Sequence, residues 1–186
     1  MNNESLASLI LRRATSLGAL LHAQRLTLVT AESCTAGGIA YAVTSVAGAS
    51  AWFDRGFITY SNESKLQVLG VSPVYLRDFG AVSEPVARAM ALGALTHSAA
   101  QAAIAVTGIA GPDGGTPDRP VGTVCFAWAI RRRSAEGLER SQGAMTTPWV
   151  RTATRHFEGD RAAVRAQSIV AALEGQIALL EQRQDV

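Results

Sequence analysis

The sequence contains only two cysteines, Cys34 and Cys125, and they lack the CxxC spacing of a zinc or redox motif. A disulfide framework or a cysteine-based zinc site is therefore not expected. The three histidines are scattered and no pair has metal-ligand spacing, so we expect neither a metal nor a cofactor. The formal net charge of +2 is too small to indicate a nucleic-acid-binding protein.

Long hydrophobic runs are also missing. No basic segment leads into an apolar stretch in residues 1–20, because Glu4, Arg12 and Arg13 interrupt the pattern, and no apolar run is long enough to span a bilayer. We therefore expect a cytoplasmic protein with no membrane segment. The length of 186 residues fits a single domain, 1–186, with a sizeable core.

Lysine is almost absent. Of the 17 basic residues, 16 are arginine, and the one lysine is Lys65. A lysine kept in such a chain can mark a place where guanidinium cannot do the work, because a buried lysine can lose its proton and an arginine effectively cannot. The alternative is that one surface lysine survived by chance, and composition alone leaves both open.

The stretch that organises the chain is Leu26–Gly38, an alternating apolar run that meets small and hydroxyl residues and then a helical pattern from Ile39 to Val46. It predicts a strand that enters a helix through a tight turn. Gly37 and Gly38 would allow a ligand or backbone to approach the first helical turn, and its free amides could hold an oxyanion formed at Ser33. The alternative is that Ser33 only caps the helix.

The remaining pattern predicts an α/β fold, a three-layer α/β/α sandwich with a mixed, mostly parallel sheet. The expected helices cover 4–23, 62–69, 71–79 (a helix or a turn), 84–99 and a last segment from about 160, and the expected strands cover 53–60, 102–106 and 121–130. We expect 138–147 to pair with 121–130 as a hairpin, and 148–158 to be irregular.

Two further strand ends carry polar residues. Tyr60 and Lys65 lie at a strand-to-helix corner where Ser61 or Asn62 can cap the helix, and in a parallel sheet this corner and the Ser33 corner could face one cleft. A glycine-rich loop, 107–116, follows another strand. It is not a nucleotide P-loop, because it has no lysine.

The remaining chemistry is that of a serine with a lysine base. The sequence has no GxSxG elbow and no Ser-x-x-Lys motif, and its histidines do not support a Ser-His-Asp triad. Lys65 can activate a hydroxyl only if its pKa falls by desolvation or a nearby positive charge. Tyr60 could hydrogen-bond the amine or relay a proton, and Cys34 is the rival nucleophile.

Several ordered motifs resemble the C-terminal domain of the competence/damage-inducible protein CinA. The segments that carry the resemblance, over nearly the whole chain, are TAESCTAGG (30–38), GFITYSN (56–62) with Lys65, GAVS (80–83), VTGIAGP (106–112) and PVGT (120–123). The resemblance implies an α/β/α sandwich that associates as a homodimer or larger assembly. It also implies hydrolysis of the carboxamide of nicotinamide mononucleotide to nicotinate mononucleotide and ammonia.

Matched position by position, the resemblance implies that Ser33 is the nucleophile, Lys65 the general base and Tyr60 a supporting catalytic residue. The implied substrate-binding residues are Thr35, Gly37, Gly38, Thr107, Gly108, Gly111, Gly114, Gly115 and Arg161. Arg161, in Gly-Asp-Arg, is the candidate for the substrate phosphate, and the alternative is a surface arginine in the first turn of the last helix.

Two positions depart from the family pattern. Ala36 replaces the first glycine of Ser-Cys-Thr-Gly-Gly, which could tighten the pocket or forbid a left-handed backbone angle. Arg119 replaces the lysine often found before Pro-Val-Gly. Two other functions stay open: an inactive partner-binding module in competence or DNA damage, and an amidase for another small amide.

Overall fold

The computed structural model describes residues 5–132 and 147–182. Its centre is a five-stranded sheet in the order β2-β1-β3-β4-β5. The strands are β1 (Leu28–Glu32), β2 (Phe53–Ile58), β3 (Ala102–Gly108), β4 (Thr123–Ile130) and β5 (Trp149–His156). β1 pairs in parallel with β2 and β3, whereas β4 pairs antiparallel with β3 and β5. The predicted mixed sheet is confirmed, but the prediction that it is mostly parallel is wrong, because two of its four strand pairs are antiparallel.

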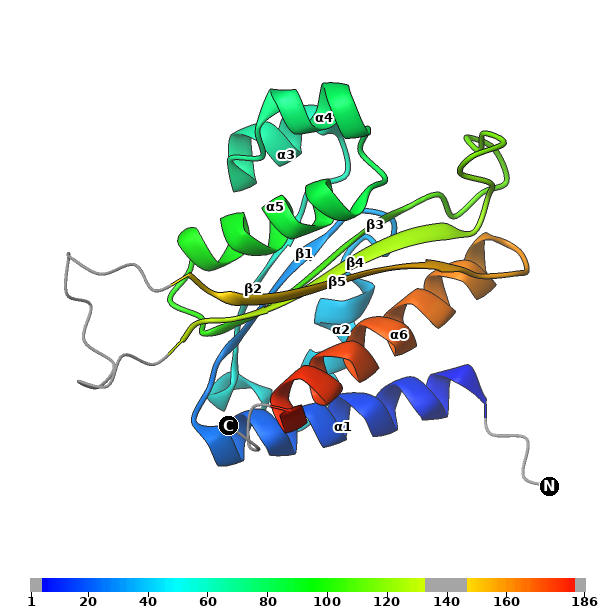
Figure 1. Ribbon diagram of the computed structural model, residues 1–186. Helices are drawn as coiled ribbons and strands as arrows, with labels where there is room; N and C mark the ends of the chain where they lie inside the picture. The colour runs from blue at the N-terminus through cyan, green and yellow to red at the C-terminus, as the bar shows by residue number, and fades with distance from the viewer. Residues whose placement is uncertain (1–4, 133–146, 183–186) are drawn as a thin grey trace.

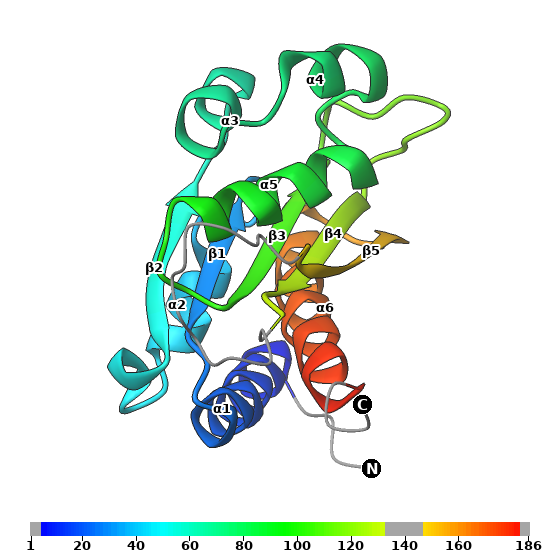
Figure 2. The same cartoon turned by 60° about the vertical axis from the view of Figure 1, so that its left-hand side comes forward.

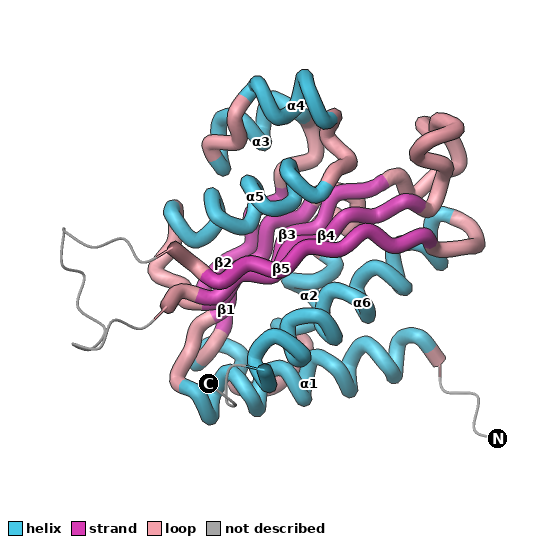
Figure 3. The backbone as a smooth tube through the Cα atoms, in the orientation of Figure 1, coloured by secondary structure: helices cyan, strands magenta, loops and turns pink. Residues whose placement is uncertain are grey.

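Helices lie on both faces of this sheet (Figures 1 and 3). The helices are α1 (Leu6–Gln24), α2 (Gly38–Thr44), α3 (Asn62–Leu69), α4 (Pro73–Phe79), α5 (Glu84–Thr96) and α6 (Arg161–Gln182). α1, α2 and α6 lie below the sheet, and α5 lies above it with α3 and α4 beyond (Figures 1 and 2). Each face has its own apolar core. Leu17 and Phe126 belong to the first, and Met90 and Ala105 to the second.

The carboxyl ends of β2, β1 and β3 lie at one edge of the sheet. Glu32, the last residue of β1, is in register with Ile58 on one side and Val106 on the other. The hydrogen-bond ladder continues for one more residue beyond these strand ends. The Ser33 amide donates to the Val106 carbonyl (3.0 Å), and the amide of Thr59, directly after β2, donates to the Glu32 carbonyl (2.8 Å). Ser33 therefore lies between the chain segments that leave β2 and β3.

Close packing between α3 and α5 fixes the other half of the site. A Cβ built on Gly93 of α5 would lie 2.0 Å from the Leu69 carbonyl oxygen of α3. Only glycine allows the two helices to approach this closely. α3 is thereby held against the body of the fold, with Lys65 on its buried side.

Two predictions near the carboxyl half need correction. Residues 148–158 are not irregular, because β5 occupies most of this range and forms the antiparallel partner of β4. β5 is an edge strand with exposed Arg151 and Arg155, so its apolar alternation is too weak to read from the sequence. The predicted hairpin strand 138–147 lies, up to residue 146, outside the described residues. α5 also ends at Thr96, before the predicted end near residue 99.

The helix α6 is long and apolar enough to cross a membrane by length and composition, and 50% of that apolar window is buried inside the fold. It packs on α1 and on the sheet. The core helix of a folded domain has the same composition, and α6 packs as such a helix.

Candidate active site

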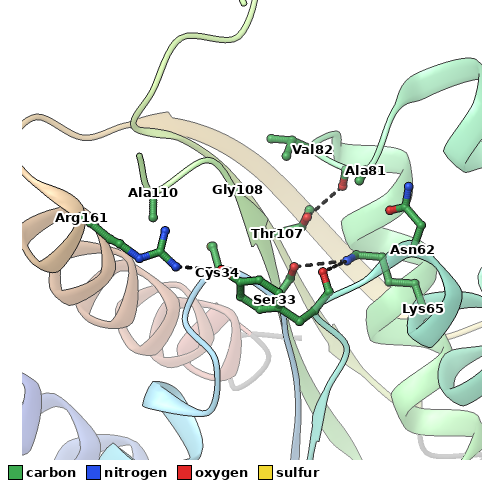
Figure 4. Close-up of a pocket in the computed structure, with 11 residues that line it drawn as sticks. Ser33, Cys34, Asn62, Lys65, Ala81, Val82, Thr107, Gly108, Ala110 and Arg161 are labelled. Carbon is green, nitrogen blue, oxygen red and sulfur yellow. Dashed lines mark hydrogen bonds between the residues drawn. The ribbon is translucent and has the colours of Figure 1, made fainter. Parts of the chain in front are cut away.

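Lys65 is buried in the second turn of α3, although charged side-chain types are almost never fully buried unless paired. The helix begins at an N-cap, Ser61, whose side chain forms a capping box with Ser64, and it ends at Gly70 with a left-handed φ of 64°. These caps match the predicted boundaries. Lys65 is 1% exposed, and its side chain extends from α3 toward the Ser33 hydroxyl (Figure 4).

Within residues 5–132 and 147–182, the lysine amine contacts only neutral oxygen atoms. Its Nζ lies 3.2 Å from Ser33 Oγ and 2.9 Å from the Thr59 carbonyl oxygen, and the carbonyl oxygens of Tyr60 and Ser61 are each 3.5 Å away. None of these partners is a carboxylate. Two carbonyls can therefore accept the N–H groups of a neutral amine while its lone pair faces the serine hydroxyl.

Burial lowers the pKa of Lys65 from its ordinary value of 10.5. Removing the amine from water disfavours its charged form, and this desolvation is the largest cause of the shift. A Cys34 thiolate would raise the pKa of Lys65, but burial raises the pKa of Cys34 itself to about 12. At neutral pH Cys34 is an uncharged thiol, so it gives the lysine no counter-charge.

Ser33, in the turn after β1, does not cap the helix α2, which was the alternative role considered for it. The N-cap of α2 is Gly37, and the Ser33 hydroxyl is hydrogen-bonded to the Lys65 amine instead of capping the helix. The Ala36 amide donates to the Ser33 carbonyl (3.0 Å), and Ala36 has a φ of 50°. The left-handed angle that alanine could have forbidden is therefore adopted with alanine in place.

Glu32 is a site residue that the sequence reasoning missed. Its fully buried carboxylate accepts hydrogen bonds from Thr35 Oγ1 (2.7 Å), the Ile39 amide (3.0 Å) and the Ala40 amide (2.8 Å). The first amides of α2 are thus occupied, and the prediction that they hold an oxyanion is wrong. An acidic residue at the end of a buried strand, just before a helix N-terminus, is the sequence signal that could have indicated this role.

Gly37 and Gly38 serve packing inside the protein. A Cβ on Gly37 would lie 3.0 Å from Ile58 Cδ1, and one on Gly38 would lie 2.6 Å from Ile169 Cδ1. Neither glycine lines the pocket described below. Thr35 also points elsewhere, because its hydroxyl donates to Glu32 and its carbonyl accepts from Arg165 at 2.9 Å.

A pocket of about 190 Å³ opens beside the Ser33–Lys65 contact (Figure 4). The residues that line it are Ser33, Cys34, Tyr60, Asn62, Lys65, Ala81, Val82, Thr107, Gly108, Ala110 and Arg161. The predicted substrate-binding residues that line this pocket are Thr107, Gly108 and Arg161. The predicted residues Gly111, Gly114 and Gly115 do not line it. Asn62, Ala81, Val82 and Ala110 were not foreseen as pocket residues, because short neutral side chains carry no sequence signal of their own.

Tyr60 and Arg161 meet at the mouth of this pocket. The Arg161 guanidinium donates to the Tyr60 hydroxyl (2.7 Å) and to the Gly111 carbonyl (2.9 Å). Tyr60 reaches Lys65 through its backbone carbonyl, and the only partner found for its hydroxyl within 5–132 and 147–182 is Arg161. The predicted hydrogen bond between the tyrosine hydroxyl and the amine is not formed.

The fold and the site together define an α/β protein with a buried serine–lysine pair at the carboxyl edge of a mixed sheet. The sequence profile of the CinA C-terminal domain matches residues 11–180, and the chain belongs to this family.

Relatives of two lengths match the chain. Nicotinamide-nucleotide amidohydrolase PncC of Escherichia coli K12 is 46% identical over 165 residues, which cover 89% of this chain and 91% of that protein. A competence-damage inducible relative of Symbiobacterium thermophilum is 52% identical over 158 residues, 85% of this chain but only 35% of the longer protein. A crystal structure of a CinA superfamily protein from Klebsiella pneumoniae superposes with a TM-score of 0.81 at 36% identity, covering 93% of this chain and 98% of that one.

Proposed function

We propose that this protein hydrolyses the carboxamide of nicotinamide mononucleotide to nicotinate mononucleotide and ammonia, with Ser33 as nucleophile and Lys65 as general base. The observation that carries the proposal is the 3.2 Å contact between the Lys65 amine and the Ser33 hydroxyl, buried at the base of a pocket. The substrate is taken from the amidohydrolase relatives that match almost the full chain.

In the first step the neutral Lys65 amine removes the proton of Ser33 as its Oγ attacks the carboxamide carbon. The tetrahedral intermediate collapses when the C–N bond breaks, and the lysine ammonium gives its proton to the leaving nitrogen. Ammonia departs and the nicotinoyl group remains as an ester on Ser33. The lowered pKa of Lys65 favours this cycle, because the amine must be neutral before each attack.

In the second step Lys65 removes a proton from a water molecule that attacks the ester carbonyl. The C–O bond to Ser33 breaks, the serine recovers its proton from the lysine ammonium, and the carboxylic acid product releases its proton to solvent and leaves as the carboxylate. In both steps negative charge develops on the carbonyl oxygen. The backbone amides of Cys34 and Thr35, the two residues that directly follow Ser33, are the proposed donors to that oxygen.

Cys34 lines the same pocket but is a weaker candidate for the nucleophile. The amine bonds to the serine oxygen, and a thiol with a pKa of about 12 is protonated at neutral pH. A Cys34→Ala variant should therefore keep activity within about tenfold, whereas loss of a nucleophile costs far more. Activity lost in Cys34→Ala and kept in Ser33→Ala would transfer the role to the thiol.

The test is ammonia release from nicotinamide mononucleotide by the purified protein and by Ser33→Ala, Lys65→Ala and Lys65→Arg variants. Each variant should lose at least about 10² to 10⁴ in rate. Lys65→Arg is the matched control, since it keeps a long basic side chain but cannot act as a base at neutral pH. A folded Lys65→Ala protein with near-normal turnover would refute the mechanism. Absence of ammonia release by the wild-type protein would instead favour a different amide substrate or the partner-binding alternative.

A further inference from the structure

Three segments that are far apart in the sequence are tied together at the mouth of the pocket by Arg161. Arg161 is the first residue of α6, Tyr60 lies at the corner between β2 and α3, and Gly111 belongs to the glycine-rich loop after β3. The Arg161 side chain points from α6 toward the pocket in Figure 4. Its two hydrogen bonds join these segments at 2.7 Å and 2.9 Å. Removing this one side chain would release both contacts.

The hydrogen bond fixes which way the Tyr60 hydroxyl can donate. Arginine only donates, so the Tyr60 oxygen must accept from Arg161 and its own proton must go to another acceptor. Among the described residues no hydrogen bond from this hydroxyl to a protein acceptor is formed. Tyr60 is 57% exposed and lines the pocket, so its hydroxyl can donate a hydrogen bond to a molecule bound at the pocket mouth.

The size of the pocket places this hydroxyl beyond the reacting group. A volume of about 190 Å³ is smaller than the roughly 300–1,000 Å³ of pockets that enclose a drug-sized ligand. A nucleotide whose carboxamide reaches buried Ser33 must leave its ribosyl phosphate portion at the mouth. Tyr60 and Arg161 lie at this mouth, whereas Lys65, which is 1% exposed, lies at the base of the pocket.

We propose that Tyr60 and Arg161 act as one substrate-recognition unit, in which Arg161 is a positioning residue and the Tyr60 hydroxyl donates to an oxygen of the ribosyl phosphate portion. The inference rests on the proposed function. It assigns Tyr60 to binding instead of proton relay, and it gives Arg161 an action through Tyr60 instead of a direct grip on the phosphate.

The unit predicts a split between KM and kcat. Tyr60→Phe removes one hydrogen bond to the substrate, so KM for nicotinamide mononucleotide should rise about 3- to 10-fold. The value of kcat should stay within about twofold, because uniform binding is lost and no transition-state contact is. Arg161→Met should produce a rise of the same order.

The decisive measurement is the double variant Tyr60→Phe/Arg161→Met. If Arg161 acts through Tyr60, the double variant should have the KM of the worse single variant, since the second change has nothing left to remove. The same four proteins are assayed with nicotinamide riboside, which lacks the phosphate. The change of substrate should alter the KM effect of both single variants in the same way. Arg161→Lys should recover part of the loss, because an ammonium can still donate to the tyrosine oxygen.

Three results would overturn the proposal. The KM increases could multiply in the double variant, or Tyr60→Phe could lower kcat with KM unchanged. Arg161→Met could also lose its effect with the riboside while Tyr60→Phe keeps its own, which is the signature of a direct phosphate contact. Arg13→Met is the control, because Arg13 also contacts α6, through Glu174 at 2.8 Å, but does not line the pocket.

Folding and the proposed reaction are checked separately. Melting temperatures of all variants within a few degrees of the wild-type value show that the fold is kept. Calorimetric titration of nicotinamide mononucleotide into Ser33→Ala, with and without Tyr60→Phe, measures binding without turnover and should show the same 3- to 10-fold loss, about one hydrogen bond. Equal affinities in these two proteins would refute the recognition unit, whereas a wild-type protein that releases no ammonia would refute the proposed reaction itself.

Discussion

Replacing Ala36 with glycine should stabilise this protein, although the position lies three residues after the proposed nucleophile. Ala36 has a φ of 50°, in the left-handed region where an L side chain crowds the following carbonyl. That conformation costs roughly 1–2 kcal/mol for a residue other than glycine. Glycine also loses more chain entropy on folding, by about 0.4–1 kcal/mol. The midpoints of these two ranges differ by about 0.8 kcal/mol, which is the expected net gain in the free energy of unfolding.

The surrounding contacts explain why the strained angle persists. The Ala36 amide closes the turn onto the Ser33 carbonyl at 3.0 Å, and Glu32 holds the first amides of α2 from behind. These bonds fix the turn whichever residue occupies position 36. Ala36→Gly should therefore relieve strain without moving Ser33, and ammonia release should stay within about twofold of the wild-type rate.

Thermal unfolding measures the gain. For a protein of this size 1 kcal/mol corresponds to about 2–4 °C, so Ala36→Gly should raise the melting temperature by about 1–4 °C. Gly48→Ala is the matched control, because Gly48 has a φ of 81° and a Cβ there would meet no atom within 4 Å. It should lower the melting temperature through backbone strain alone. A lower melting temperature for Ala36→Gly as well would refute the strain argument.

Three further predictions follow from buried groups. Lys65→Met should be more stable than the wild type at neutral pH. The pKa of Lys65 in the folded protein lies below 10.5, so between that lowered pKa and 10.5 the unfolded chain binds more protons than the folded one. The stability of the wild type therefore rises with pH across this window. Urea unfolding from pH 6 to 10.5 should show the advantage of Lys65→Met shrinking as pH rises, and a constant difference would contradict it. Glu32→Gln places an N–H₂ group against backbone donors and should cost about 1–3 kcal/mol in urea unfolding, with unchanged stability as the contrary result. Gly93→Ala puts a methyl 2.0 Å from the Leu69 carbonyl oxygen. It should lower the free energy of unfolding by about 1–3 kcal/mol and slow ammonia release. Wild-type values of both would argue against the packing of α3 on α5.

The elements of the fold follow from local sequence signals, because each depends on residues close together in the chain. The caps Ser61 and Gly70 bound α3 where hydroxyl and glycine residues predict them. The apolar run 102–106 predicts a buried central strand because it has no polar face, and β3 contains this run. β5 escaped prediction for the opposite reason, since an edge strand with exposed arginines has neither a continuous apolar run nor a clean alternation.

The contact between Ser33 and Lys65 could be expected but not established from the sequence. The two residues are 32 positions apart, and they meet only because β2 pairs with β1 and α3 packs on α5. Strand order and register are long-range properties that the pattern of one strand does not specify. The role of Glu32 has the same origin, because whether a carboxylate turns toward a helix N-terminus or into a pocket depends on where the next turn places the helix.

The single lysine of an arginine-rich chain has a physical reason in this environment. In the part of the chain that the structure describes, every oxygen bonded to its amine is neutral, and the side chain is 1% exposed. An arginine here would remain charged and would need a buried carboxylate, since an unpaired buried charge costs several kcal/mol. Lysine can meet the same burial by losing its proton, and the amine that results is the base the proposed reaction needs. Desolvation thus links the composition of the chain to the chemistry of its site, and the same burial that makes Lys65 costly to stability makes it useful as a base.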